Sequence, residues 1–410
     1  DEIDDDKINL TQLVKNFTKP THIPASQVIL ISNENKTLSN KSLLNIINFF
    51  NKTSCVKFRN VSQKMVTKGF ILQNGSYNNV IVIENLTTIQ LTECCSKNNS
   101  CVKYFFGLAL GMIPQVNRKD RNNFVFVFVN NINSTDQSRF DMLSSPLFEE
   151  KNYSFDFGSY FNRNPYYCST RKGIKTYTSL NASVYYDRML GQKIEYSFAD
   201  RRALCNYYNI KAFKNMTCQN GGFYNPNTSS CICPDEYIGV DCSKLQETSN
   251  CGHQVVNATK DEEYLFACGN KTCYYEITSS NKKIIEMELL TVHTKNITPC
   301  VSHYGLEIRY GVDKGTTGLS LCGLYNETIS IKSLSNKVFI GYNGGPDDYF
   351  LMSYKAINEA KKMKKQTKKQ FKDQITDQII IKDDDRKKIS MDFNCEELLK
   401  AGLISQINLP

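Results

Sequence analysis

Histidine is the side chain best suited to hold zinc or to act as a general base near neutral pH, and its placement limits the chemistry open to this chain. The four histidines are His22, His253, His293 and His303. Only His22 precedes residue 218, so the first half of the chain cannot assemble a zinc site from three imidazoles. A Cys–His nucleophilic pair there would have to use His22, and nothing around it indicates an activated base. The sequence also lacks a glycine-rich phosphate loop and a G-x-S-x-G motif.

Cysteine is the second residue type that could bind a metal. The chain has 16 cysteines, which is too many for a typical cytosolic chain of this size. Cys94, Cys95 and Cys101 are close enough in sequence to suggest zinc ligands, but in an oxidising compartment disulfides are favoured. The even count permits complete pairing.

Asn-x-Ser/Thr sequons indicate the compartment. They occur 18 times, and together with the cysteines they predict a secreted or luminal, glycosylated protein. The sequons that we select as glycosylation sites are Asn51, Asn60, Asn85, Asn152, Asn181, Asn257, Asn296 and Asn326.

Length and composition indicate a folded chain of two or three domains. It has 410 residues, of which 40% are hydrophobic and 22% charged. The longest apolar run, Phe105 to Ile113, is far shorter than the roughly 20 residues of a membrane-spanning helix, so we expect no membrane span. Much of the net charge of +9 lies between Lys355 and Lys372, where there are eight lysines and one acid, Glu359. Such a tail is typical of a solvated helix, or alternatively of a patch for anionic glycans or membrane surfaces. We expect no nucleic-acid partner, because the chain is predicted to be secreted and contains no recognisable nucleic-acid-binding module.

Hydrophobic patterns predict the elements that position the candidate residues. Ser42 to Phe50 has the spacing of a core-facing helix, capped by Ser39 or Asn40. Val102 to Ile113 reads as a buried helix. Val80 to Ile83 and Phe124 to Val129 are β-branched and aromatic runs that predict buried strands. Residues 251 to about 354 alternate short strand-like runs with turns, the pattern of an all-β sandwich.

The stretch from residue 218 to residue 242 contains four cysteines, which are separated by Gly, Asn and Pro turn residues. The segment Cys218-Gln-Asn-Gly-Gly, followed by Cys231-Ile-Cys233-Pro and Cys242, resembles an EGF-like module. Two of the module's usual six cysteines are absent, and they normally bond each other. The resemblance therefore implies the pairs Cys218–Cys231 and Cys233–Cys242, which staple a unit too small for its own core.

The next hundred residues resemble a CUB domain. The resemblance rests on the runs that begin at Asn270, at Cys300-Val-Ser-His-Tyr-Gly-Leu-Glu-Ile-Arg and at Leu321-Cys-Gly. It implies Cys251–Cys273 and Cys300–Cys322 bridges. Many CUB domains bind calcium through an Asp at the position held here by Tyr304, and a neutral phenol is a poor ligand for Ca²⁺. We therefore expect no calcium site.

An EGF-like module followed by a CUB-like one is a known tail of astacin metalloproteases, and scattered segments of the first 215 residues resemble that family in order. They are Phe50 to Phe58, Phe155 to Ser159, Leu190 to Gln192, and Ser197 to Leu204. The resemblance implies an α+β metzincin domain with a bridge between Cys55 and Cys205.

The zinc motif of that family, H-E-x-x-H-x-x-G-x-x-H, falls on Tyr104 to Pro114. Gly107, Ala109, Leu110 and Gly111 fit the pattern. The three histidine positions are held by Tyr104, Leu108 and Pro114, and the catalytic glutamate by Phe105. In the Met-turn that follows in this family, Phe161 stands at the position of the methionine. Arg163 stands at the position of the tyrosine that stabilises the oxyanion. The resemblance thus implies a domain without catalytic or metal-binding residues.

Apolar side chains at these positions can fill the space that metal and ligands would occupy. We predict that Phe105, Leu108 and Phe161 form part of one apolar cluster, the alternative being an open cleft in which they meet solvent. We predict no cofactor, with zinc reserved for the alternative that the chain is still a peptidase.

The predicted fold is multidomain: an α+β astacin-like domain, a small disulfide-stapled EGF-like module and an all-β CUB-like sandwich. The boundaries are 1–40 for an N-terminal segment, 41–212 astacin-like, 213–246 EGF-like, 247–354 CUB-like and 355–410 for the charged tail. The cysteines left without an assigned pair are Cys94, Cys95, Cys101, Cys168, Cys268 and Cys395.

The predicted function is that of a secreted, glycosylated astacin-like pseudoprotease that binds an extracellular protein or glycan. One alternative is a zinc metalloendopeptidase of the astacin family, the label that overall similarity would give. The other is a structural component of extracellular matrix or a surface coat.

Overall fold

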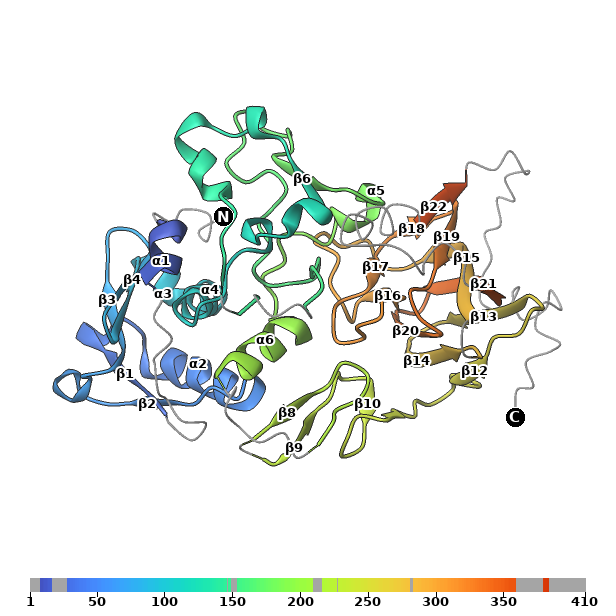
Figure 1. The fold of residues 1–410 in the computed structure, drawn as a ribbon, viewed down its shortest axis with the longest axis horizontal. Helices are drawn as coiled ribbons and strands as arrows, with labels where there is room; N and C mark the ends of the chain where they lie inside the picture. Colours follow the sequence, from blue (N-terminus) through green and yellow to red (C-terminus); the bar gives the residue numbers. More distant parts are fainter. Residues whose placement is uncertain are drawn as a thin grey trace. The chain divides into compact units, whose positions relative to one another are not determined.

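The computed structural model describes residues 8–16, 28–145, 147–148, 153–208, 216–226, 228–280, 283–358 and 379–382. Contacts within the chain divide it into two compact units, whose elements are labelled in Figure 1. Unit 1 comprises Asp1–Tyr177 and Gly191–Cys233, and unit 2 comprises Thr178–Leu190 and Pro234–Pro410. The division falls inside the predicted EGF-like stretch, at residue 233.

A five-stranded sheet of order β2-β1-β3-β5-β4 is the base of unit 1. Its strands are parallel except β4, which runs antiparallel to β5. Their bounds are Ile29–Asn33 (β1), Phe58–Asn60 (β2), Gly69–Asn74 (β3), Asn79–Ile83 (β4) and Leu86–Leu91 (β5). Buried and partly exposed residues alternate along β5, so one face of the sheet carries the core. The predicted strand at residues 80–83 is confirmed as β4.

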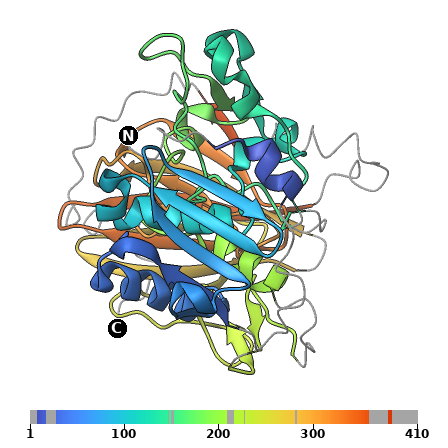
Figure 2. The same cartoon turned by 90° about the vertical axis from the view of Figure 1, so that its left-hand side faces the viewer.

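Helices cover this sheet, and in Figure 2, where the sheet faces the viewer, α4 passes behind it. The helices of unit 1 are Leu10–Asn16 (α1), Asn40–Thr53 (α2), Glu93–Lys97 (α3), Asn99–Ala109 (α4) and Phe198–Tyr208 (α6). In α2 the buried residues Leu43, Ile46, Ile47 and Phe50 follow helical spacing, and the Ser39 side chain accepts the Ser42 N–H as the N-cap. The predicted helix and one of its two proposed caps are therefore confirmed.

The remainder of unit 1 is built mostly from turns and short 3₁₀ helices. The 3₁₀ helices are Glu34–Lys36, Gln63–Met65, Gln115–Asn117, Arg121–Asn123, Val129–Asn131 and Ser134–Phe140. The short strands of unit 1 are Val125–Val127 (β6), Phe223–Asn225 (β8) and Ser230–Ile232 (β9), and strand β7 (Tyr177–Ser179) spans the boundary between the two units.

The prediction of a buried strand from Phe124 to Val129 is wrong in extent. Only Val125–Val127 is a strand, and it pairs with one neighbour, β7, in a two-stranded ribbon. A ribbon of two strands has little core to face, and Phe126 and Val129 are 53% and 52% exposed.

Two sheets form a sandwich in unit 2. One has the order β12-β14-β20-β16-β17 and the other β13-β21-β15-β19-β22. The strands of the first are Val255–Asn257 (β12), Lys271–Thr278 (β14), Lys337–Gly344 (β20), Gly305–Arg309 (β16) and Leu319–Leu321 (β17). Those of the second are Glu263–Cys268 (β13), Tyr349–Asn358 (β21), Lys283–His293 (β15), Thr328–Lys332 (β19) and Ile379–Lys382 (β22). Phe350 of one sheet packs against Tyr275 and Tyr342 of the other, so aromatic rings fill the space between them. The all-β prediction is confirmed.

Three smaller features complete unit 2. They are helix α5 (Ser183–Tyr186), strand β18 (Leu324–Tyr325), which pairs with β15, and the hairpin of β10 (Tyr237–Ile238) and β11 (Lys244–Leu245). Strand β21 extends to residue 358, beyond the predicted start of the charged tail at 355, and β22 lies within that tail. The rest of the tail is outside the described residues. Within the described part of the chain, no helix is both long and apolar enough to cross a membrane.

Candidate functional site

Helix α4 carries the residues that align with a zinc motif, and local sequence defines where it begins and ends. The Asn98 side chain caps it by accepting the N–H groups of Ser100 and Cys101. A disulfide joins Cys95 of α3 to Cys101 in its first turn. The helix ends at Ala109, and Gly111 then takes a positive φ of 93°, a conformation that glycine adopts without strain.

The three motif positions on α4 point into the core. Tyr104, Phe105 and Leu108 are all 0% exposed, and with Phe161 they belong to one hydrophobic cluster. We call these four residues the α4 cluster. The Tyr104 ring stacks on that of Phe161 at a centroid distance of 5.5 Å and meets Phe105 edge-on at 5.4 Å. The predicted apolar cluster is therefore confirmed, and the alternative of an open cleft with these side chains in solvent is excluded.

Gly107 explains how closely the rest of unit 1 approaches the helix. A Cβ at this position would lie 2.2 Å from Phe161 Cζ and 2.4 Å from Tyr196 Oη. Only a residue without a side chain leaves space for these two rings. The Tyr196 hydroxyl in turn donates to the Lys103 carbonyl at 2.6 Å, which fixes the ring against the helix.

A buried carboxylate holds the turn that presents Phe161. Asp200 accepts the Ser159 hydroxyl at 2.7 Å and the Tyr160 N–H at 2.8 Å. It also accepts the N–H of Ser197, whose hydroxyl accepts the Asp200 N–H, so the two residues form a capping box for α6. Burial, and next the neighbouring carboxyl of Asp156, raise the pKa of Asp200 to about 7.

Two cations face the ring of Tyr104. The guanidinium of Arg163 lies 5.3 Å from its centroid and 4.4 Å from that of Tyr167. The ammonium of Lys193 lies 5.4 Å from the Tyr104 centroid and donates to the carbonyls of Tyr160 and Asn162, both at 2.7 Å. Arg163 is 3% exposed. The region therefore already contains positive charge, stabilised by aromatic faces and carbonyl oxygens.

Zinc does not fit this set of side chains. At the four aligned positions of the motif stand a phenol, a phenyl ring, an isobutyl group and the ring of Pro114, and none of them is a usual zinc donor. Two cations beside Tyr104 would also repel a divalent metal ion. His22 lies outside the described residues. Within the described ranges, no three His, Cys, Asp or Glu side chains are grouped as a metal site requires. The absence of a cofactor stays a prediction.

Disulfides are present within each of the two units. The structure contains Cys55–Cys205, Cys218–Cys231, Cys251–Cys273 and Cys300–Cys322, the same pairs that the resemblances imply. Cys233, Cys242 and Cys268 are also disulfide-bonded. The half-buried thiol of Cys168 has a pKa raised to about 11, first by burial and then by Asp136, so it is a poor nucleophile. Cys395 lies outside the described residues. This many disulfides indicate that the chain folds in an oxidising compartment.

The predicted glycosylation sites divide by exposure. Six are exposed in the folded chain: Asn51, Asn60, Asn85, Asn257, Asn296 and Asn326. Asn181 is 8% exposed, and its Nδ2, the atom to which a glycan attaches, is buried. Glycosylation of all these sites stays a prediction. Asn152 lies outside the described residues.

Sequence reasoning missed two residues of this site. Asp200 could have been found, because Ser197-x-x-Asp200 directly before an apolar helix is a capping-box pattern. Lys193 had no local signal, since its partners are carbonyls more than 30 positions away.

Comparison with known proteins identifies the family of this domain. The model of the astacin family of peptidases matches residues 18–209. The zinc metalloproteinase nas-34 of Caenorhabditis elegans is 28% identical over 290 residues, covering 70% of this chain and 47% of that protein. The zinc metalloproteinase nas-16 of the same organism is 26% identical, covering 70% of this chain and 63% of that protein. The chain thus spans about half to two thirds of the length of these curated relatives.

Solved structures were compared as well. The chain resembles high choriolytic enzyme 1, a hatching enzyme zinc-protease of medaka fish, at 16% identity and a TM-score of 0.38, over 44% of this chain and 88% of that one. It resembles the CUB1-EGF-CUB2 region of human MASP-1/3 at 16% identity and a TM-score of 0.22, over 34% of this chain and 55% of that one. The family match rests on the sequence comparisons, and it places a domain of the astacin peptidase family at residues 18–209 of this chain.

Proposed function

We propose that this chain is a secreted, glycosylated astacin-like pseudoprotease that acts by binding a partner. The α4 cluster is the observation that carries the proposal. Where an astacin peptidase needs three imidazoles and a glutamate, Tyr104, Phe105 and Leu108 are fully buried in one hydrophobic cluster with Phe161, whose ring stacks on that of Tyr104. The side chains of Tyr104, Phe105 and Leu108 supply neither the imidazole ligands nor the carboxylate general base that such a peptidase uses to activate water.

Further features support a binding role outside the cell. The pairs Cys218–Cys231, Cys251–Cys273 and Cys300–Cys322 are those of EGF-like and CUB-like modules, which we propose for residues 213–246 and 247–354. Six exposed sequons provide sites for glycans on both units. Modules of this kind commonly add binding surfaces to a secreted protein, and a domain without catalysis can retain such a use.

Zinc content is the decisive test. The secreted full-length protein is dialysed against a weak chelator, and zinc is measured by elemental analysis beside an active astacin treated in the same way. We expect well under one zinc per chain for this protein and about one for the active control. One tightly held zinc per chain would overturn the proposal.

The zinc-peptidase alternative is kept because relatives such as nas-34 and nas-16 are named zinc metalloproteinases. It requires chelator-sensitive cleavage of peptides by the full chain, which we do not expect. Removal of residues 247–354 should abolish the role of a matrix or coat component, and equally that of a protein that binds through its CUB-like module. It should not abolish a function whose active surface lies in the astacin-like domain.

A further inference from the structure

The stretch from residue 35 to residue 83 carries a positive charge that nothing within it balances. It contains six lysines, one arginine and no acidic residue. The seven cations are Lys36, Lys41, Lys52, Lys57, Arg59, Lys64 and Lys68. They lie between residues 36 and 68, the part of unit 1 that forms α2, β2 and the 3₁₀ helices flanking them. One region of the astacin-family domain is therefore strongly basic.

Four of these cations form what we call the basic rim: Lys36, Lys41, Arg59 and Lys64. All four are exposed in the folded chain. None of them makes an ion pair within the described part of the chain, whereas the exposed Lys97 pairs with Glu93 at 2.6 Å. An exposed cation without a partner charge keeps its field toward solvent. The basic rim can therefore attract an anionic partner.

A hollow of about 640 Å³ lies at the carboxyl ends of β1 and β2. The two strands are parallel, and Ile31 pairs with Asn60 in their register, so the loops that leave them start next to each other. The loop after β1 continues into α2, and the loop after β2 continues through the 3₁₀ helix Gln63–Met65 to β3. Because these two loops diverge, a crevice remains between them, which is a common place for ligands in open parallel sheets.

Hydroxyl and amide side chains line most of this hollow. They are those of Ser32, Asn33, Asn40, Asn60, Ser62 and Gln63. Such groups both donate and accept hydrogen bonds. The basic rim adjoins them, because Lys36 is itself a lining residue and each of the other three members is next in the chain to one. The hollow thus combines neutral hydrogen-bonding groups with positive charge.

Glu34 is an acidic residue of the lining, but its carboxylate is already engaged with the sheet. Its Oε2 accepts the Nε2 of Gln73 on β3 at 2.9 Å, and its Oε1 is buried. An anion that approaches from solvent therefore meets the exposed basic rim first.

We propose that this hollow and the basic rim bind a sulfated polysaccharide outside the cell, with sulfate groups at the rim and sugar hydroxyls at the amides. Clusters of lysine and arginine attract sulfated glycans by charge. A polysaccharide also supplies the second half of the match, since its hydroxyls pair with the amide and hydroxyl side chains of the lining. The inference rests on the proposed secretion and binding role, to which it gives a chemistry.

Other polyanions fit this surface less well. An anionic membrane would be held by apolar side chains that enter the lipid as well as by charge, and Val61 is the apolar residue of the lining. Single-stranded nucleic acid is bound by aromatic rings on which its bases stack, and the lining residues include no aromatic ring.

The test uses the secreted full-length protein and a heparin oligosaccharide of defined length. Asn40 and Asn60 lie in sequons at the hollow, so the N-glycans are first trimmed to one sugar with an endoglycosidase, which prevents long glycans from covering it. The oligosaccharide is titrated by calorimetry at physiological ionic strength, beside the same oligosaccharide without its sulfates. We expect saturable binding of the sulfated probe and at least about tenfold weaker binding of the desulfated one. Equal binding of both, or binding of neither, would overturn the proposal.

Two further probes distinguish the other polyanions. They are phosphatidylserine vesicles and single-stranded DNA of the same net charge as the oligosaccharide. We expect both to bind more weakly than the sulfated oligosaccharide. If either binds as tightly, the surface does not select a glycan and the proposal is overturned.

Variants locate the binding within the molecule. Arg59→Gln combined with Lys64→Gln should weaken binding of the sulfated probe by about fivefold, because two exposed ion pairs are lost. Lys361→Gln combined with Lys362→Gln is the matched control, since it removes the same charge from the C-terminal lysine run, and it should change the affinity less than about twofold. Thermal melts verify that each variant is folded.

An equal loss of affinity in the two double variants would overturn the proposed site, because the net charge of the chain would then explain the binding. These outcomes are separate from those of the proposed function. Failure of the oligosaccharide to bind leaves the zinc measurement unaffected, and a stoichiometric zinc would overturn the pseudoprotease proposal without changing the result for the oligosaccharide.

Discussion

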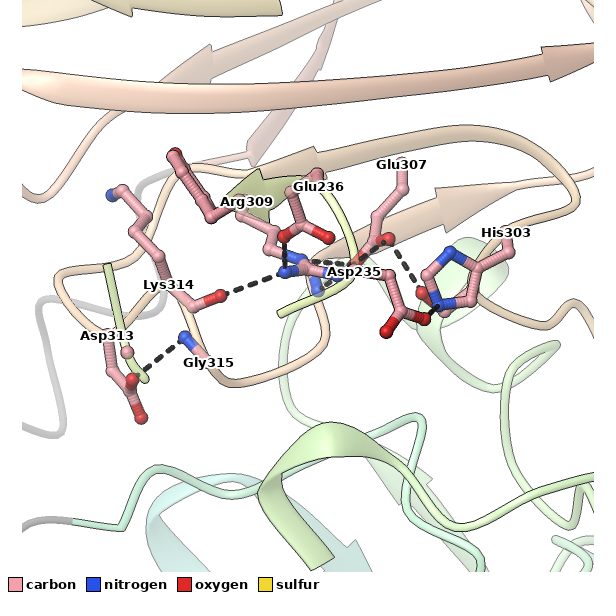
Figure 3. A network of polar contacts seen from close by, with 12 residues as sticks. Asp235, Glu236, His303, Glu307, Arg309, Asp313, Lys314 and Gly315 are labelled. Atoms are coloured by element: carbon pink, nitrogen blue, oxygen red, sulfur yellow. Dashed lines mark hydrogen bonds and ion pairs between the residues drawn. The ribbon is translucent and has the colours of Figure 1, made fainter. Parts of the chain in front are cut away.

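The α4 cluster of unit 1 and a charged network in unit 2, formed by Glu236, Glu307 and Arg309 (Figure 3), are both buried, but they are stabilised in opposite ways. In the α4 cluster, positions that would hold metal ligands carry aromatic and aliphatic side chains, and packing fills the space. In the charged network, Glu236, Arg309 and Glu307 remain ionic and depend on one another. The difference shows that apolar side chains can be buried through packing alone, whereas a buried charge can be kept only with its partners.

The comparison predicts which region tolerates substitution less. In the α4 cluster, a substitution that changes the size or polarity of a side chain loses packing contacts and so lowers stability. In the charged network the loss of one member leaves buried charges uncompensated. The four predictions below run from the largest expected effect to the smallest.

Arg309→Met should cause the largest loss of stability. It leaves Glu236 and Glu307 buried without their shared cation, which typically costs about 3–5 kcal/mol. Urea unfolding of the variant and the parent measures the difference. Lys332→Met is the matched control: it breaks a pair with Glu286 at 3.4 Å in which the lysine is 42% exposed, and such pairs contribute about 1 kcal/mol at most. Equal effects of the two substitutions would contradict the role assigned to the charged network.

Leu108→His should destabilise unit 1 by about 1–3 kcal/mol, because it places a polar ring in an apolar space. Leu108→Met keeps the site apolar and should have a smaller effect. Thermal melts of both variants provide the measurement. If both melt with the parent, the position is not core and the described packing is wrong.

Asp200 should give stability a pH dependence. Its pKa of about 7 in the folded state lies above the ordinary value near 4, so between these pH values the folded state holds a proton that the unfolded chain has released. Its contribution is therefore fully present below about pH 4 and is lost as the pH rises to about 7. Asp200→Asn removes this titration.

Urea unfolding at several pH values between 4 and 8 tests this. The stability of the parent relative to Asp200→Asn should fall as the pH rises through that window. A difference that stays constant, or that grows with pH, would show that Asp200 does not have a raised pKa.

Phe105→Glu should produce no peptidase activity. A carboxylate at this position has no metal-activated water to deprotonate at neutral pH. Cleavage of a general peptide substrate is followed with and without a chelator. Phe105→Gln is the matched control, since it disturbs the same packing without a carboxylate. Chelator-sensitive cleavage by the Glu variant alone would indicate a metal site that the described residues do not reveal.

Local patterns were sufficient for the elements with strong periodicity. The helix at residues 42–50 has apolar residues at helical spacing and a serine cap, and the structure has α2 there with Ser39 as its cap. The α4 cluster followed from the types of Tyr104, Phe105 and Leu108, because apolar side chains on a helix are buried if the surrounding space permits.

Non-local contacts accounted for the errors. Phe124 to Val129 reads as a buried strand, yet the run has a single strand neighbour and two of its apolar side chains are exposed. The charged network was not predicted at all, because Glu236 and Arg309 are 73 positions apart and neither has a local signal.

The Cys55–Cys205 bridge also determines what one proteolytic cut would do to the astacin-family domain. It joins two cysteines that are 150 positions apart. Because a closed loop of this length lowers the conformational entropy of the unfolded chain, the bridge stabilises the folded state by about 5 kcal/mol. A protease that cuts the backbone once between the two cysteines produces two pieces that remain joined through sulfur. On a gel, the cut protein should migrate as one species without reductant and as two with it.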